Sequence, residues 1–153
     1  MAAKLGLSQL EPEDDALASD FLSLLAAEQC DFTLAFRRLN DLVSDESEQG
    51  VADLFDFPAA FSDWLERWHK RLESDSADVS TRLLAMKQAN PTFIPRNHLV
   101  AEAIDEAVQN NDFSAFNHLV DLLSTPQDYH PDLARFALPP RPEQVVSRTF
   151  CGT

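Results

Sequence analysis

Apolar residues recur every three or four positions along almost the whole chain, and this spacing restricts the fold more than any other feature. A period of this length places apolar side chains on one face of an α-helix, whereas a half-buried strand needs strict alternation. The pattern predicts about six helices, separated by polar or proline-containing steps. They cover residues 12–25, 31–43, 58–72, 78–89, 99–110 and 112–124. We therefore expect an all-α fold, built as a compact helical bundle.

Two of the predicted helices begin in the same way, with an aspartate followed by a phenylalanine and a hydroxyl residue. These are the steps 31–33 and 112–114. An aspartate carboxylate at such a position accepts hydrogen bonds from the first backbone N–H groups of a helix. A shared capping arrangement explains the similarity more simply than a tandem repeat does.

Prolines concentrate at the end of the sequence, where five of the nine lie between Pro126 and Pro142. Proline fixes φ and lacks a backbone donor, so these residues predict an extended, irregular arm. We expect a helical domain over residues 1–125 and a Pro-rich tail over residues 126–153. The tail is expected to lie either against that domain or against a missing part of a larger protein.

The chain is strongly acidic, with 26 Asp and Glu against 12 Lys and Arg and a net charge of −14. Nucleic acids and anionic membranes both bind through basic surfaces, so neither is an expected partner. No apolar run reaches the roughly 18 residues that a bilayer span needs. Two cysteines in 153 residues do not make a disulfide scaffold, and we expect the protein in the reducing cytoplasm.

No arrangement of residues indicates an active site. Three glycines are too few for a Gly-rich phosphate loop, and the four histidines lack the spacing of a zinc site. Asp128, His130 and Asp132 alternate in the tail, which is more typical of a solvated turn than of a metal site. For His98, a side chain satisfied at a helix start is a simpler explanation than ligand binding. The sequence therefore predicts no catalytic, cofactor-binding or metal-binding residue in this chain.

Residues 90–98 form an unusual break between two predicted helices. Pro91 and Pro95 force an extended or turning backbone there. Arg96 offers five donors in a planar fork, which suits helix C-terminal carbonyls or a buried carboxylate. Asn97 is predicted to cap the helix that follows. We expect this segment to be ordered and structural.

The two cysteines lie in different settings. Cys30 falls at the end of an apolar helix face, where a free cysteine behaves as a small hydrophobic residue. Cys151 lies two residues from the end of a Pro-rich arm, within reach of oxidants and of distant thiols. A redox role and an inert terminal thiol are both compatible with that placement.

The break and the terminal cysteine resemble the C-terminal region of the selenoprotein O/YdiU family. The family shows an Asn-Pro-x-Phe/Tyr-x-x-Arg-Asn motif and a Cys-Gly-Thr or Cys-Ser-Ser end. The motif matches Asn90, Pro91, Phe93, Arg96 and Asn97, and the end matches Cys151, Gly152 and Thr153. Residues 4–7, 31–39 and 111–113 also match family positions, so the resemblance covers nearly the whole chain.

The resemblance implies that this chain is the C-terminal fragment of a larger protein. Family members look like protein kinases in fold and are understood to transfer AMP from ATP, with Mg or Mn, to Ser, Thr or Tyr of target proteins. Their nucleotide-binding, metal-binding and catalytic residues lie upstream of the matched region, so none transfers to this sequence. We therefore expect no cofactor in this chain, and the missing upstream kinase-like core as its partner. In the family, a disulfide between the position of Cys151 and the core is implicated, which implies a redox role for Cys151.

Three functions of different classes follow from these observations. The first is a non-catalytic helical part of a protein adenylyltransferase, which supports the kinase-like core and presents Cys151. The second is a stand-alone helical interaction module with an exposed Phe and Trp surface. The third is an independent enzyme with an unrecognised acidic site. The resemblance favours the first function, and the missing catalytic motifs disfavour the third.

Overall fold

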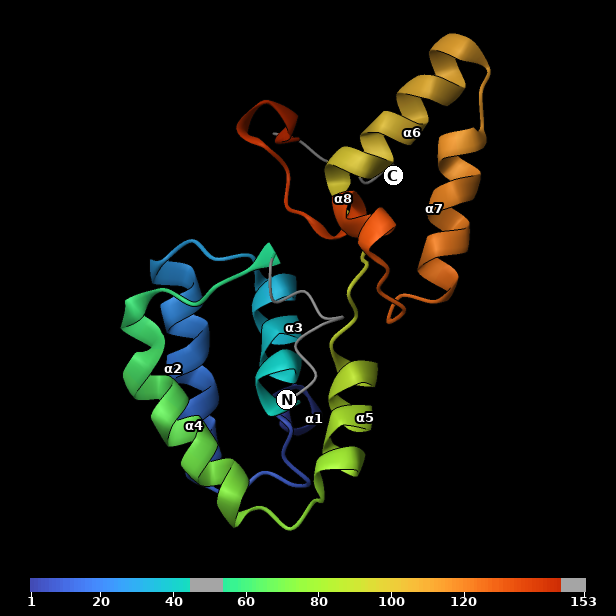
Figure 1. Ribbon diagram of the computed structural model, residues 1–153. Helices are drawn as coiled ribbons and strands as arrows, with labels where there is room; N and C mark the ends of the chain where they lie inside the picture. The colour runs from blue at the N-terminus through green and yellow to red at the C-terminus, as the bar shows by residue number, and fades with distance from the viewer. Residues whose placement is uncertain (45–53, 147–153) are drawn as a thin grey trace. The chain divides into compact units, whose positions relative to one another are not determined.

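The computed structural model describes residues 1–44 and 54–146, and the chain divides into two compact units within the proline-containing break. Unit 1 is Met1–Thr92 and unit 2 is Phe93–Thr153. Every regular element in the described residues is helical (Figure 1), which confirms the all-α class. Eight α-helices occur there against about six expected, because α1 (Ala2–Leu5) and α8 (Ala134–Ala137) are four-residue helices too short to show a periodic pattern.

Unit 1 arranges five helices around an aromatic core. After α1 it contains α2 (Asp14–Ala27), α3 (Phe32–Val43), α4 (Ser62–Ser74) and α5 (Val79–Ala89), with a 3-10 turn at Ala59–Phe61. Helix α2 packs against α4, while α5 contacts both α1 and α3 (Figure 1).

Local signals set the limits of several helices in unit 1. The Asp31 carboxylate accepts a hydrogen bond from the Leu34 N–H at 2.9 Å, as expected for the cap of α3. The Asp78 carboxylate accepts one from the Thr81 N–H at 3.0 Å at the start of α5. Helix α1 ends at Gly6, whose φ of +74° is left-handed and where a Cβ would lie 2.7 Å from the sulfur of Met86. Glycine is therefore required at this position for both conformation and space.

Two tryptophans of α4 form the centre of the core. Trp64 stacks on Phe21 of α2 with ring centroids 4.2 Å apart, and its Nε1 donates to the Leu17 carbonyl at 2.8 Å. The Nε1 of Trp68 donates to the Leu5 carbonyl at 2.9 Å. Each indole thus combines apolar burial with a satisfied donor, which fixes α4 against both α2 and α1.

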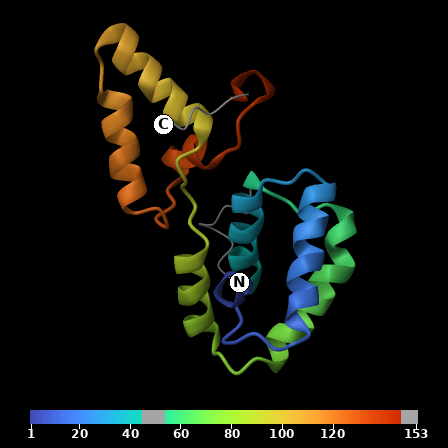
Figure 2. The same ribbon diagram turned by 180° about the vertical axis from the view of Figure 1, so that it is seen from behind.

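Unit 2 contains a helical hairpin of α6 (Asn97–Asn110) and α7 (Ser114–Ser124), which run side by side (Figures 1 and 2). Asn111 adopts a left-handed conformation with φ of 52° and ends α6. The Asp112 carboxylate then accepts a hydrogen bond from the Ser114 N–H at 2.8 Å, which supports the start of α7.

The tail is less extended than the sequence predicts. Between Pro126 and residue 146 it contains Pro131–Leu133, α8 and Pro142–Gln144, which are all short helical segments. Phe136 of α8 is buried and stacks on the His118 ring of α7, with centroids 4.8 Å apart. This part of the tail therefore lies against its own unit. The division into domains 1–125 and 126–153 stays a prediction, whose boundary falls directly after α7.

Candidate functional site

Asn90, the first residue of the family-like motif, lies at the end of α5 and binds residues of α1 and α3. Its buried side chain donates from Nδ2 to the Lys4 carbonyl at 2.9 Å and to the Asn40 side-chain oxygen at 3.0 Å. The Lys4 ammonium donates in return to the Ala89 carbonyl at 2.7 Å and to the Asn90 Oδ1 at 3.3 Å. These four hydrogen bonds, and a fifth from the Arg37 Nη1 to the Asn90 carbonyl at 3.5 Å, join the end of α5 to α1 and α3.

The second half of the motif serves unit 2. Phe93 is buried, and its backbone N–H donates to the Pro126 carbonyl at 3.0 Å. The Arg96 guanidinium is buried and donates from Nη2 to the carbonyl of Ala137, the last residue of α8, at 2.6 Å. The expected role of Arg96 at a helix C-terminal carbonyl is therefore confirmed.

The predicted cap at Asn97 is wrong. Arg96 has extended backbone angles and is the residue that precedes the helix, whereas Asn97 is exposed and already helical. No side-chain cap forms at this helix start, because a capping side chain must come from the non-helical position. Asn90 therefore makes its described hydrogen bonds within unit 1, whereas Phe93 and Arg96 make theirs within unit 2.

The histidine candidates differ in their surroundings. The His130 Nδ1 lies 3.3 Å from the Asp132 carboxylate, and both side chains are largely exposed, as in a solvated turn. His98 is buried, and its Nδ1 has no hydrogen-bond partner among the described residues. Burial, followed by the nearby charge of Arg96, lowers the pKa of His98.

Neither a metal centre nor a membrane span emerges from the described residues. Within residues 1–44 and 54–146, no group of three or more His, Cys, Asp or Glu could hold a metal ion. In the same ranges, every helix is too short or too polar to cross a membrane. Burial, followed by the charge of Glu28, raises the pKa of the half-buried Cys30 thiol. Cys151 lies outside the described residues.

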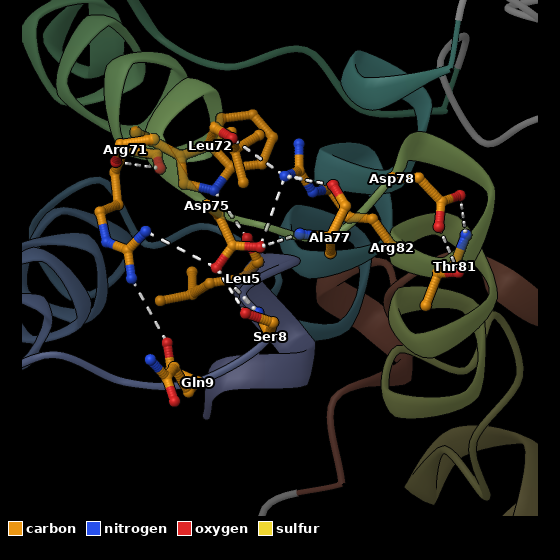
Figure 3. Close-up of polar contacts among 12 residues, drawn as sticks. Leu5, Ser8, Gln9, Arg71, Leu72, Asp75, Ala77, Asp78, Thr81 and Arg82 are labelled. Carbon is orange, nitrogen blue, oxygen red and sulfur yellow. Dashed lines mark hydrogen bonds and ion pairs between the residues drawn. The ribbon is translucent and has the colours of Figure 1, made fainter.

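Asp75 forms the centre of a polar cluster in unit 1 (Figure 3). Its side chain is only 2 % exposed and accepts hydrogen bonds from the Ser8 N–H at 3.0 Å, the Ser8 hydroxyl at 2.9 Å and the Ala77 N–H at 3.0 Å. Arg71 and Arg82 each place a guanidinium nitrogen 3.6 Å from this carboxylate. The cluster joins the segment after α1 to the turn between α4 and α5.

The charge state of Asp75 follows from these contacts. Burial by itself would raise the pKa of the carboxyl group, because it disfavours the charged form. The N–H groups of Ala77 and Ser8, the Ser8 hydroxyl and the Arg82 guanidinium favour that form more strongly, so the pKa lies below its ordinary value. The contacts of Asp75 therefore favour its carboxylate form.

An apolar groove lies along the α6–α7 hairpin of unit 2. It has a volume of about 350 Å³ and is lined by apolar side chains alone: Val100, Ala103, Ile104, Ala107, Phe113, Phe116, Leu119, Val120 and Leu123. Phe113 and Phe116 remain 53 % and 54 % exposed. Exposed aromatic side chains that share one concave surface are typical of an interaction site. Among the described residues, we regard this α6–α7 groove as the best candidate functional site.

Sequence patterns locate the groove only in part. Ile104, Phe113, Phe116 and Val120 belong to the apolar stripes that predict the two helices, but the structure leaves these four side chains exposed. A second signal is the apolar series Val100, Ile104 and Val108, which supplements the buried series of Leu99 and Ala103 on α6. By contrast, no local pattern predicts the contact of Lys4 with Asn90 or that of Asp75 with Ser8, because these partners lie 86 and 67 positions apart.

Known proteins similar to this chain are considerably longer. The family model described as "Protein adenylyltransferase SelO" matches residues 1–124. "Protein nucleotidyltransferase YdiU" of Rhodopseudomonas palustris strain CGA009 is 45% identical over 154 residues, and those of strain BisB5 and of Rhizobium etli strain CIAT 652 are each 46% identical. Each alignment covers 100% of this chain and 31% of the relative, so the chain spans about a third of the length of these curated relatives.

Proposed function

Because the chain belongs to the protein adenylyltransferase SelO family, we propose that it forms the helical C-terminal part of such an enzyme. In this proposal it is non-catalytic and supports a kinase-like core, which transfers AMP from ATP to Ser, Thr or Tyr of target proteins in the cytoplasm. ATP and Mg or Mn bind the core, in the two thirds of the polypeptide outside this chain. The observation that carries the proposal is an alignment over 100% of this chain that covers only 31% of its relatives.

The contacts of the family-like motif support a structural role. The Asn90 side chain bonds to the Lys4 carbonyl, the Asn40 amide and the Lys4 ammonium, and Arg96 donates to the Ala137 carbonyl, each within its own unit. The Asp75 carboxylate is similarly committed to Ser8, Ala77 and two guanidinium groups. Side chains engaged in this way stabilise a scaffold, whereas a general base or a metal ligand needs an oxygen directed at substrate or ion.

A chimeric enzyme tests this function. The last third of the Rhodopseudomonas palustris relative, which this chain matches at 45% identity, is replaced by this chain. We expect the chimera to transfer labelled AMP from ATP to protein, and the isolated chain to transfer none. Transfer by the isolated chain, or a folded chimera that binds ATP but transfers no AMP, would contradict the proposal.

The proposal includes a redox role for Cys151, which extends the family resemblance of the Cys-Gly-Thr end. Oxidation would join the Cys151 thiol to a thiol of the core as a disulfide, with an external oxidant accepting two electrons. The chimera and its Cys151→Ser variant are assayed under oxidising and reducing conditions. We expect AMP transfer by the chimera to respond to oxidation and that of the variant to stay constant. Identical responses of the two proteins would exclude the redox role.

A stand-alone interaction module is the second candidate function, and the exposed α6–α7 groove is the observation that favours it. Its expected Phe and Trp surface is only half present, because both tryptophans are buried in unit 1 while Phe113 and Phe116 are exposed. This candidate predicts that removal of the matched third from the relative leaves AMP transfer intact. The support role predicts that the same truncation abolishes it.

A further inference from the structure

We propose that the α6–α7 groove binds an amphipathic helix with flanking Lys or Arg residues, contributed by the part of the family polypeptide that lies outside this chain. This inference rests on the proposed function and adds the surface and the chemistry of the contact. The lining residues of the groove supply no hydrogen-bonding side chain, so its occupant must present an apolar face.

The dimensions of the groove suit a helix. One side of its lining runs from Phe113, the residue before α7, to Leu123, which is about 15 Å along a helix axis. On α6 the lining runs from Val100 to Ala107. A third helix laid between two such stripes would bury the half-exposed rings of Phe113 and Phe116 and complete a three-helix arrangement.

Charge restricts the occupant further. From Asn97 to Ser124 the hairpin contains five acidic residues and no Lys or Arg: Glu102, Asp105, Glu106, Asp112 and Asp121. Glu102 alone among them has an ion pair with a described residue, Arg135, at 3.4 Å on the surface. None of these five carboxylates lines the groove, so they act on a partner through the overall negative charge of the hairpin, which favours a partner that carries Lys or Arg.

A second copy of this chain fits the groove poorly. The chain has a net charge of −14, and two acidic hairpins brought face to face would repel each other. The relatives, by contrast, contain more than twice as much additional polypeptide, since the aligned region covers 31% of their length. The family match over residues 1–124 also includes every lining residue of the groove, so groove and occupant can both belong to the shared family architecture.

Binding of synthetic peptides to this chain tests the inference. Labelled peptides of about 20 residues, long enough for several helical turns, cover the part of the Rhodopseudomonas palustris relative outside the aligned region. Fluorescence anisotropy then measures their affinity for the full chain. We expect binding by peptides that combine an apolar helical face with Lys or Arg, and a loss of affinity as salt rises from about 50 to about 300 mM.

Matched variants locate the binding surface. Phe116→Asp and Val120→Asp change half-exposed residues of the groove, and Leu84→Asp changes a similarly exposed apolar residue of α5 in unit 1. Circular dichroism establishes that each variant remains helical. We expect either groove variant to weaken binding at least about tenfold and Leu84→Asp to change it less than about twofold.

Three results would overturn the inference. They are the absence of peptide binding, binding that survives both groove variants, and self-association of the chain that the groove variants abolish in sedimentation velocity. The chimera assay separates this failure from that of the proposed function. If the chimera is active but no peptide binds, only this inference is contradicted. If peptides bind specifically but the folded chimera is inactive, the support role in catalysis is contradicted.

Discussion

Replacement of Asn90 by alanine is expected to lower the free energy of unfolding of unit 1 by about 2–6 kcal/mol. The Asn90 Nδ2 is a donor to two acceptors, the Lys4 carbonyl and the Asn40 side-chain oxygen, in a part of the molecule where Asn90 itself is 1 % exposed. An acceptor that loses its partner in a buried setting costs about 1–3 kcal/mol, and two such losses lead to the range stated. The Lys4 ammonium also loses its contact with Asn90 Oδ1.

Tryptophan fluorescence during urea unfolding is a suitable assay, because both tryptophans of the sequence lie in the core of unit 1. For a domain of 60–100 residues, each kcal/mol shifts the melting temperature by about 4–8 °C, so Asn90→Ala should lower Tm by at least about 8 °C. Asn97→Ala is the matched control within the same motif. Asn97 is exposed and makes no capping hydrogen bond, so its replacement should change stability by less than about 0.5 kcal/mol.

The two variants together decide whether buried hydrogen bonds explain the motif. If Asn97→Ala costs as much as Asn90→Ala, or if Asn90→Ala is within about 0.5 kcal/mol of the unchanged chain, the contacts described for Asn90 do not stabilise unit 1 as argued.

Three further predictions concern single positions. Gly6→Ala should destabilise unit 1 by at least about 1–2 kcal/mol in urea unfolding, because the left-handed φ and the sulfur 2.7 Å from a new Cβ both oppose it; a neutral effect would contradict this account. Asp75 has a pKa below that of the unfolded chain, so its stabilising contribution is complete above about pH 4 and is lost as the pH falls through the folded value. Asp75→Asn should therefore be less stable at neutral pH and lose less stability on acidification, and parallel urea titrations with equal pH dependence would refute this. Cys30, whose pKa is raised, should react with iodoacetamide more slowly than Cys151 at neutral pH, and mass spectrometry of the alkylated peptides would detect the reverse order.

The longer helices are predictable because their signals are local. The apolar periods of α2 to α7 and the Asp31 cap depend on residues within a few positions of each other, and both appear in the structure. Helix α1 lacks such a signal. Its four residues are held by Trp68 and Asn90, which lie more than 60 positions further along the chain.

The start of α6 and the exposure of the α6–α7 groove cannot be predicted from local sequence, for two physical reasons. The sequence restricts the start of α6 to a few residues, but the extended Arg96, bound to the Ala137 carbonyl, excludes Asn97 from the capping position. An apolar stripe also looks the same whether it faces a core or a groove. Phe116 therefore marks a helix correctly in the sequence, while its 54 % exposure depends on which elements cover it.

The contacts of α1 with Trp68 and Asn90 affect the order in which unit 1 folds during synthesis. Helix α1 is too short to persist alone in water, since helices below about 12 residues are marginal even in favourable sequences. Its Lys4 carbonyl binds Asn90 across a sequence separation of 86, and its Leu5 carbonyl binds Trp68 across 63. Contacts between such distant residues slow folding, because a long loop must close before they form. Helix α1 must therefore wait without these partners until α5 has emerged from the ribosome, and unit 1 becomes complete only then.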